Sequence, residues 1–75
     1  MKAYLDIDHD SGIAAYDDGP GFIRVQFSDG SVYLYTDASA GSSNIAAMRR
    51  LAASGDGLNA YIITYVKRLY ARKER

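Results

Sequence analysis

A four-residue segment, Ser28-Asp29-Gly30-Ser31, constrains the fold of this chain more than any other feature. It lies between two runs, residues 22–27 and 32–36, in which apolar and polar residues alternate. Asp-Gly readily supplies the two positive φ angles of a type I′ turn, so the segment predicts a tight β-hairpin. The turn type also sets the register, with Phe27 expected opposite Val32 and the remaining pairs following in step.

The expected register assigns each side chain of the hairpin to one of two faces, because residues opposite one another share a face. The face expected to cover the core carries Ile23, Val25, Phe27, Val32 and Leu34. The other face carries Phe22, Arg24, Gln26, Tyr33 and Tyr35. We therefore expect one apolar face and one face on which aromatic rings surround an arginine.

A shorter strand, Ile13-Ala14-Ala15-Tyr16, precedes the hairpin and ends at Asp17-Asp18-Gly19-Pro20-Gly21, a dense turn signal. If all five turn residues form the loop, Tyr16 lies opposite Phe22 and joins the aromatic face. Ile13 and Ala15 are then expected on the core face.

The second half of the chain predicts two helices separated by Gly55-Asp56-Gly57. Ser42-Ser43-Asn44 offers capping side chains for the first helix, whose apolar residues recur at helical spacing until Gly55. The second helix is expected over residues 58–73, where apolar residues again recur every three or four positions.

Together these elements predict an α+β fold: a three-stranded antiparallel β-meander followed by two helices packed on one face. Residues 4–8 alternate as well, which predicts either an extra N-terminal edge strand or an ordered arm. We expect a single domain over residues 1–75, with the arm or edge strand at 1–10, the meander at 11–37 and the helical hairpin at 42–73.

The formal net charge is zero, yet the charges are unevenly distributed. Residues 1–40 carry seven Asp against Lys2 and Arg24, a balance of −5, whereas residues 41–75 carry seven Lys and Arg against Asp56 and Glu74, a balance of +5. The basic residues near the C-terminus are Lys67, Arg68, Arg72, Lys73 and Arg75. Such a run can contact phosphates, but it equally complements the dipole of a helix and solvates its outer face.

Short motifs are spread over residues 10–70: Asp10-Ser11-Gly12-Ile13, Tyr16-Asp17, Ile23-x-Val25-x-Phe27-x-x-Gly30, Tyr33-Leu34-Tyr35 and Gly55-x-Gly57-Leu58-Asn59-x-Tyr61-Ile62. Together they resemble the KTSC domain, a small domain found at the C-terminus of some lysyl-tRNA synthetases and as stand-alone bacterial proteins. A central Tyr-x-Tyr is the best-kept feature of that family. The resemblance implies a fold of this size, an unknown activity and an association with RNA. The chain departs from the fuller family pattern between Tyr35 and Asn44.

The sequence assembles no nucleophile, base and oxyanion stabiliser, so we predict a non-catalytic binding module and not an enzyme. RNA or another single-stranded nucleic acid is the preferred partner, with bases stacked on the aromatic face and phosphates on the cations. The candidate residues are Tyr16, Phe22, Arg24, Tyr33, Tyr35, Lys67, Arg68, Arg72 and Lys73. The alternative is a protein-interaction or homodimerisation module that uses the same tyrosine-rich face. A purely structural role, in which the tyrosines cover the outer face of the sheet, is the commoner reason for such a pattern, because Tyr is a favoured strand residue.

Several other classes of function are not expected. The chain has no Cys, which excludes a disulfide framework, a thiolate zinc site and a thiol nucleophile. Asp6-x-Asp8-x-Asp10 resembles the start of a calcium loop, but the required Gly comes one position late, and His9 alone cannot form a metal cluster. No apolar run approaches a membrane span and no signal-peptide pattern occurs. We therefore expect a cytoplasmic protein with no metal, cofactor, membrane partner or small-molecule substrate.

Overall fold

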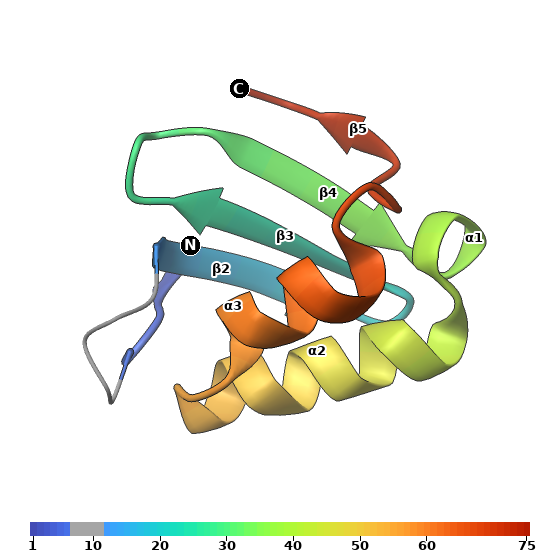
Figure 1. The fold of residues 1–75 in the computed structure, drawn as a ribbon, viewed down its shortest axis with the longest axis horizontal. Coiled ribbons are helices and arrows are strands. Elements are labelled where there is room, and N and C mark those ends of the chain that lie inside the picture. Colours follow the sequence, from blue (N-terminus) through green and yellow to red (C-terminus); the bar gives the residue numbers. More distant parts are fainter. Residues whose placement is uncertain (7–11) are drawn as a thin grey trace.

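The computed structural model describes residues 1–6 and 12–75, which form a sheet covered on one side by helices (Figure 1). The elements in chain order are β1 Lys2–Ala3, β2 Ile13–Gly19, β3 Phe22–Phe27, β4 Val32–Thr36, α1 Asp37–Ala40, α2 Ser42–Ser54, α3 Leu58–Tyr61, the π-helix η1 Ile62–Val66 and β5 Arg72–Lys73. The described strands form one antiparallel sheet in the order β1-β2-β3-β4-β5. The expected α+β fold is confirmed, and so is the extra N-terminal edge strand, although this strand comprises Lys2–Ala3 where residues 4–8 were expected.

The core lies between the sheet and the helical layer formed by α2, α3 and η1. On α2 the buried residues Ile45, Met48 and Ala52 follow helical spacing and form one apolar stripe. This helix ends where expected, because Gly55 adopts a left-handed conformation with φ 78° and its N–H donates to the carbonyls of Leu51 and Ala52.

The loop between β3 and β4 is one residue longer than expected. The Gly30 N–H donates to the Phe27 carbonyl over 2.9 Å, and the Phe27 N–H donates to the Ser31 carbonyl over 2.8 Å. With Gly30 at φ 92°, these bonds define a type I turn followed by a bulged glycine. Gln26 therefore lies opposite Val32, which the expected register had paired with Phe27.

The shift of one residue moves every side chain of β4 to the opposite face, because the side-chain period of a strand is two. Tyr33 and Tyr35 therefore face the helices, and Tyr35 is only 1% exposed. Val32 and Leu34 lie on the outer face of the sheet. The expected assignment of faces was thus wrong for β4.

The loop between β2 and β3 is shorter than expected. Gly19 pairs with Phe22, so only Pro20 and Gly21 form the turn. Gly21 has φ 81°, which suits the position after a proline in a type II turn. Asp17 and Asp18, which we assigned to the loop, belong to β2.

The shorter loop changes the place of Tyr16, which lies opposite Val25 and is buried in the core instead of facing Phe22. A register shift between Ile13 and Ala15 keeps Ile13 buried, as expected. The shorter loop also places Ala15 opposite Gln26 on the outer face, contrary to expectation.

The second helical segment ends at Val66, so the expected helix through Lys73 is wrong beyond that residue. The chain instead returns to the sheet, where the Ala71 N–H donates to the Leu34 carbonyl and the Glu74 N–H to the Val32 carbonyl, each over 2.7 Å. Pairing in this way satisfies backbone groups at the edge of β4 that a longer helix would have left exposed.

The described helices include none long and apolar enough to cross a membrane. Asp8 and Asp10 of the calcium-like motif, and the single histidine His9, lie outside the described residues.

Candidate functional site

The outer face of the sheet carries a network of charges in place of the expected aromatic surface. The Arg24 side chain on β3 forms a close ion pair with Glu74 and a longer one with Asp17, whose carboxylate lies 3.7 Å away. Arg72 also pairs with Glu74 over 3.0 Å. The hydrogen bond from Arg24 lowers the pKa of the Glu74 carboxyl. Of the four aromatic residues expected on this face, only Phe22 lies there, beneath the Arg24 guanidinium.

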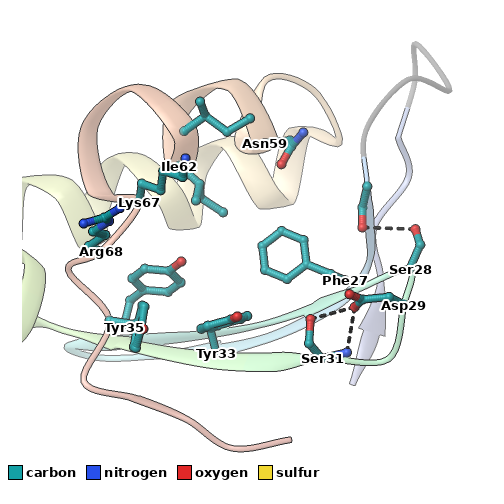
Figure 2. A pocket seen from close by; sticks show the side chains of 13 residues that line it. Phe27, Ser28, Asp29, Ser31, Tyr33, Tyr35, Asn59, Ile62, Lys67 and Arg68 are labelled. Carbon is teal, nitrogen blue, oxygen red and sulfur yellow. Dashed lines mark hydrogen bonds between the residues drawn. The ribbon is translucent and has the colours of Figure 1, made fainter.

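A cleft of about 610 Å³ opens instead on the helical side of the sheet (Figure 2). The sheet contributes three aromatic side chains, Phe27, Tyr33 and Tyr35. Opposite them lie residues of α3 and η1, and the segment after η1 closes one end. The other end is closed by the β3–β4 turn.

The aromatic rings of the cleft pack edge to face. The Tyr33 ring lies 5.7 Å from the Phe27 ring and 4.9 Å from the Tyr70 ring, measured between centroids, with interplanar angles of 83° and 64°. Phe27 and Tyr33 are each half-buried, and Tyr70 is 38% exposed. The aromatic rings that line the cleft are therefore held in place by contacts with one another, but they remain partly accessible to a ligand.

Tyr35 lies beneath the Tyr70 ring and is almost fully buried. Burial, with smaller contributions from Tyr33 and Tyr70, raises the pKa of its hydroxyl to about 12. The hydroxyl therefore stays protonated at neutral pH, when it keeps its capacity to donate a hydrogen bond.

Lys67 and Arg68 follow η1 at one end of the cleft, and both are exposed. Neither forms an ion pair with any acidic side chain in residues 1–6 and 12–75. By contrast, Lys2, Arg24 and Arg49 are all engaged by carboxylates of β2 or of the C-terminal segment. The two cations of the cleft are therefore available for an anionic ligand.

The opposite end of the cleft is acidic. The Asp29 carboxylate accepts hydrogen bonds from the Ser31 N–H, over 2.9 Å, and from the Ser31 hydroxyl, over 2.6 Å. These bonds lower the pKa of the Asp29 carboxyl, so it is ionised at neutral pH. Figure 2 shows Asp29 and the pair of cations at opposite ends of the cleft.

The cleft brings together four of the residues chosen from the sequence: Tyr33, Tyr35, Lys67 and Arg68. The other five lie elsewhere. Tyr16 is in the core, with the Lys2 amine 4.9 Å from its ring centroid, and Phe22, Arg24 and Arg72 occupy the outer face. Lys73 lies opposite Tyr33 on β5, with its amine 5.8 Å from the Tyr33 ring centroid.

Sequence reasoning missed Phe27, Asn59 and Tyr70 as cleft residues. The Asn59 side-chain amide lines the cleft and forms no hydrogen bond with another described residue. Tyr70 comes into the cleft only because the chain leaves the helix after Val66 and pairs with β4. No local signal marks that departure, since Leu69 continues the helical spacing.

The described residues include no group of three or more His, Cys, Asp or Glu side chains that could hold a metal ion. No protein-family model, no curated protein and no solved structure matches the chain. The chemistry of the cleft must therefore be inferred from its own residues.

Proposed function

We propose that the protein is a small non-catalytic module that binds single-stranded RNA in this cleft. The observation that carries the proposal is that half-buried rings, Phe27 and Tyr33, lie in one cleft with two unpaired cations, Lys67 and Arg68. Aromatic rings stack with unpaired bases, and cations neutralise the phosphates that accompany them. The partner is the one expected from the sequence, but the proposed surface is on the other side of the sheet.

The volume of the cleft and the rigidity of its aromatic surface support the binding of an unpaired base. Its volume of about 610 Å³ falls within the range of roughly 300–1,000 Å³ that is usual for small-ligand sites. Phe27 and Tyr33 stand on adjacent strands, so the backbone hydrogen bonds of the sheet hold the stacking surface in place. Such a surface needs little ordering when a base binds, which favours affinity.

The proposed relationship to KTSC domains favours RNA among the nucleic acids, because that domain accompanies some lysyl-tRNA synthetases. Its Tyr-x-Tyr feature corresponds to Tyr33-Leu34-Tyr35 in this chain. Both of these tyrosines line the cleft.

An NMR titration of the full chain with a short single-stranded RNA, at two salt concentrations, tests the proposal. Shift changes are expected at Phe27, Tyr33, Lys67 and Arg68. If both cations contact phosphates, a plot of the logarithm of the binding constant against the logarithm of the salt concentration should have a slope of about −1.4, because each phosphate contact to a single strand contributes about −0.7. The absence of any shift change at low salt would refute RNA binding.

A pair of double variants tests the location of the site. Lys67→Gln with Arg68→Gln should lose most of the affinity and most of the salt dependence. Arg50→Gln with Arg75→Gln is the matched control, because it removes the same charge from two exposed cations that do not line the cleft. An equal loss in both variants would mean that binding follows overall charge and not the cleft.

Self-association is a second candidate function, favoured by exposed apolar residues near η1. Ile63, Tyr65 and Leu69 are 58%, 62% and 42% exposed, and apolar surface of this kind is common at protein interfaces. Light scattering after gel filtration reports the molar mass. A dimer that Ile63→Ser converts to a monomer would favour this function, and a monomer at high concentration would exclude it.

A further inference from the structure

The charges of the cleft are arranged along its length in a way that limits how a nucleic acid can enter it. Lys67 and Arg68 stand at one end, and the ionised carboxylate of Asp29 stands at the other (Figure 2). Between them lies the aromatic wall formed by Phe27 and Tyr33. The charge therefore differs between the two ends of the cleft: two unpaired cations attract anions at one end, and at the other end the Asp29 carboxylate opposes them, although the nearby charge of Lys73 offsets part of its repulsion.

A continuous strand carries a phosphate on each side of every internal nucleotide. If such a strand ran along the cleft, one phosphate would lie near Lys67 and Arg68 and the next would approach Asp29. The second contact is repulsive and is made against a carboxylate whose position is held by two hydrogen bonds from Ser31. A nucleotide whose phosphates all lie at the cationic end avoids this repulsion.

Given the proposed function, on which this step rests, we infer that the cleft takes one nucleotide and not a continuous strand. The phosphate lies against Lys67 and Arg68, and the base stacks at Phe27 and Tyr33 with its polar edge toward Asp29. The ligand class is a nucleotide whose base carries an exocyclic amino group, either free or at the end of an RNA strand.

The preference for an amino group follows from the chemistry of Asp29. An ionised carboxylate accepts hydrogen bonds and donates none. Its Oδ1 atom already accepts from Ser31, and within the described residues Oδ2 has no hydrogen bond or ion pair. Cytosine, adenine and guanine present an exocyclic amino group to such an acceptor, whereas uracil has carbonyl oxygens at the corresponding positions and can donate only its ring N3–H, which lies between them.

Asn59 supports the same orientation. It lies on α3 at the side of the cleft opposite Phe27 (Figure 2), and its amide both donates and accepts hydrogen bonds. Since this amide has no protein partner in the described residues, it is free to bond a base that rests on the Phe27 side of the cleft.

Calorimetric titration of the full chain tests the inference with CMP, UMP, cytidine and oligocytidylates of increasing length, each oligonucleotide with and without a 5′-phosphate. CMP should bind at least about tenfold more tightly than cytidine, because the phosphate contacts two cations. CMP should also bind at least about fivefold more tightly than UMP. Among the oligocytidylates that carry a 5′-phosphate, affinity should not rise with length.

The two sources of the nucleotide are separated by one comparison. Equal affinity for CMP and for the 5′-phosphorylated oligonucleotide identifies a free-nucleotide site, and tighter binding of the oligonucleotide identifies a strand end. Both results support a single-nucleotide cleft. Affinity that climbs steadily with length and ignores the terminal phosphate would overturn this inference while leaving RNA binding intact. Failure of every nucleotide and oligonucleotide to bind would overturn both.

Asp29→Asn isolates the acidic end without disturbing the turn, because an Asn side chain keeps the oxygen that accepts from Ser31. This variant should bind longer oligocytidylates more tightly than the wild type and should lose most of the preference for CMP over UMP. Asp56→Asn removes the same charge outside the cleft and should change neither property. Identical behaviour of the two variants would overturn the role of Asp29.

Discussion

Tyr33 lies directly opposite Val25 across the β3–β4 ladder, and this pairing turns both tyrosines of β4 toward the helices. The expected register paired Tyr33 with Gln26, which would have placed both rings on the open face. A single residue in the loop therefore decides whether the aromatic surface is an exposed platform or the wall of a cleft.

RNA binding should depend on the cleft and not on the outer face. Tyr33→Leu removes a stacking ring from the cleft, and because such a ring contributes about 1–3 kcal/mol per base, affinity should fall by about 5- to 150-fold. Phe22→Leu, on the outer face, should leave affinity unchanged. Fluorescence anisotropy with a labelled RNA measures the affinity of both variants. A larger loss of affinity in Phe22→Leu would mean that RNA binds on the outer face of the sheet and not in the cleft.

Gly30→Ala should destabilise the protein by about 1–2 kcal/mol, because Gly30 has φ 92° and an L-residue with a Cβ adopts that conformation at a cost. Among the described residues, and apart from the two chain neighbours of Gly30, no atom lies within 4 Å of the position that a Cβ would occupy, so the loss would be conformational and not steric. Gly30→Asn should cost less, since Asn tolerates positive φ. Urea denaturation compares the two, and equal losses would contradict the bulged-glycine turn.

Tyr4→Phe should destabilise the protein by about 1–3 kcal/mol. The buried Tyr4 hydroxyl accepts a hydrogen bond from the Leu58 N–H over 3.2 Å, and its removal leaves that buried N–H without a partner. Tyr65→Phe serves as the control because Tyr65 is 62% exposed and should show no change. If thermal unfolding midpoints of the two variants agree, the Tyr4 bond does not hold the N-terminal residues onto α3.

Acid should weaken the protein partly through Asp18. Lys2 and Arg49 donate hydrogen bonds to its carboxylate, over 2.8 Å and 2.9 Å, and lower its pKa. A pKa that is lower in the folded state stabilises the fold above the unfolded value, about 3.9, and this contribution disappears as the pH falls through the folded value.

Asp18→Asn should therefore be less stable than the wild type at neutral pH, and the difference should shrink as the pH falls below about 4. Urea denaturation across this pH range measures the difference. If the difference in unfolding free energy between the two proteins stays constant down to the lowest pH, the ion pairs of Asp18 do not account for that difference.

The helices and strands themselves were largely predictable, because local patterns specify them. Ile45 and Met48 recur at helical spacing, and Gly55 ends α2 with the left-handed conformation that glycine favours. The end of the second helical segment was not predictable, because Leu69 fits the helical spacing equally well. The chain leaves the helix at Val66 since the edge of β4 offers backbone partners that only the assembled sheet provides.

Some residues of the candidate site could be predicted from the sequence and others could not. Tyr33 and Tyr35 were identified together with Lys67 and Arg68, because aromatic and basic residues carry the chemistry of nucleic-acid binding wherever they lie. Tyr70 and Asn59 were missed, since their places depend on the path of the chain after α2. Tyr16 was wrongly included because the turn after it is three residues shorter than its Gly, Pro and Asp content suggested.

That Tyr33 and Tyr35 share a face follows from the sequence alone, because side chains two apart in a strand always do. Which face they share depends on contacts that form only in the folded protein. Asp-Gly serves both a two-residue turn and a three-residue turn with a bulged glycine, and the two differ by one residue of register. Two contributions favour the longer turn: the hydrogen bonds that Ser31 donates to Asp29, and the burial of Tyr35 beneath the helical layer. The burial of Tyr35 is possible only once the helices have packed on the sheet.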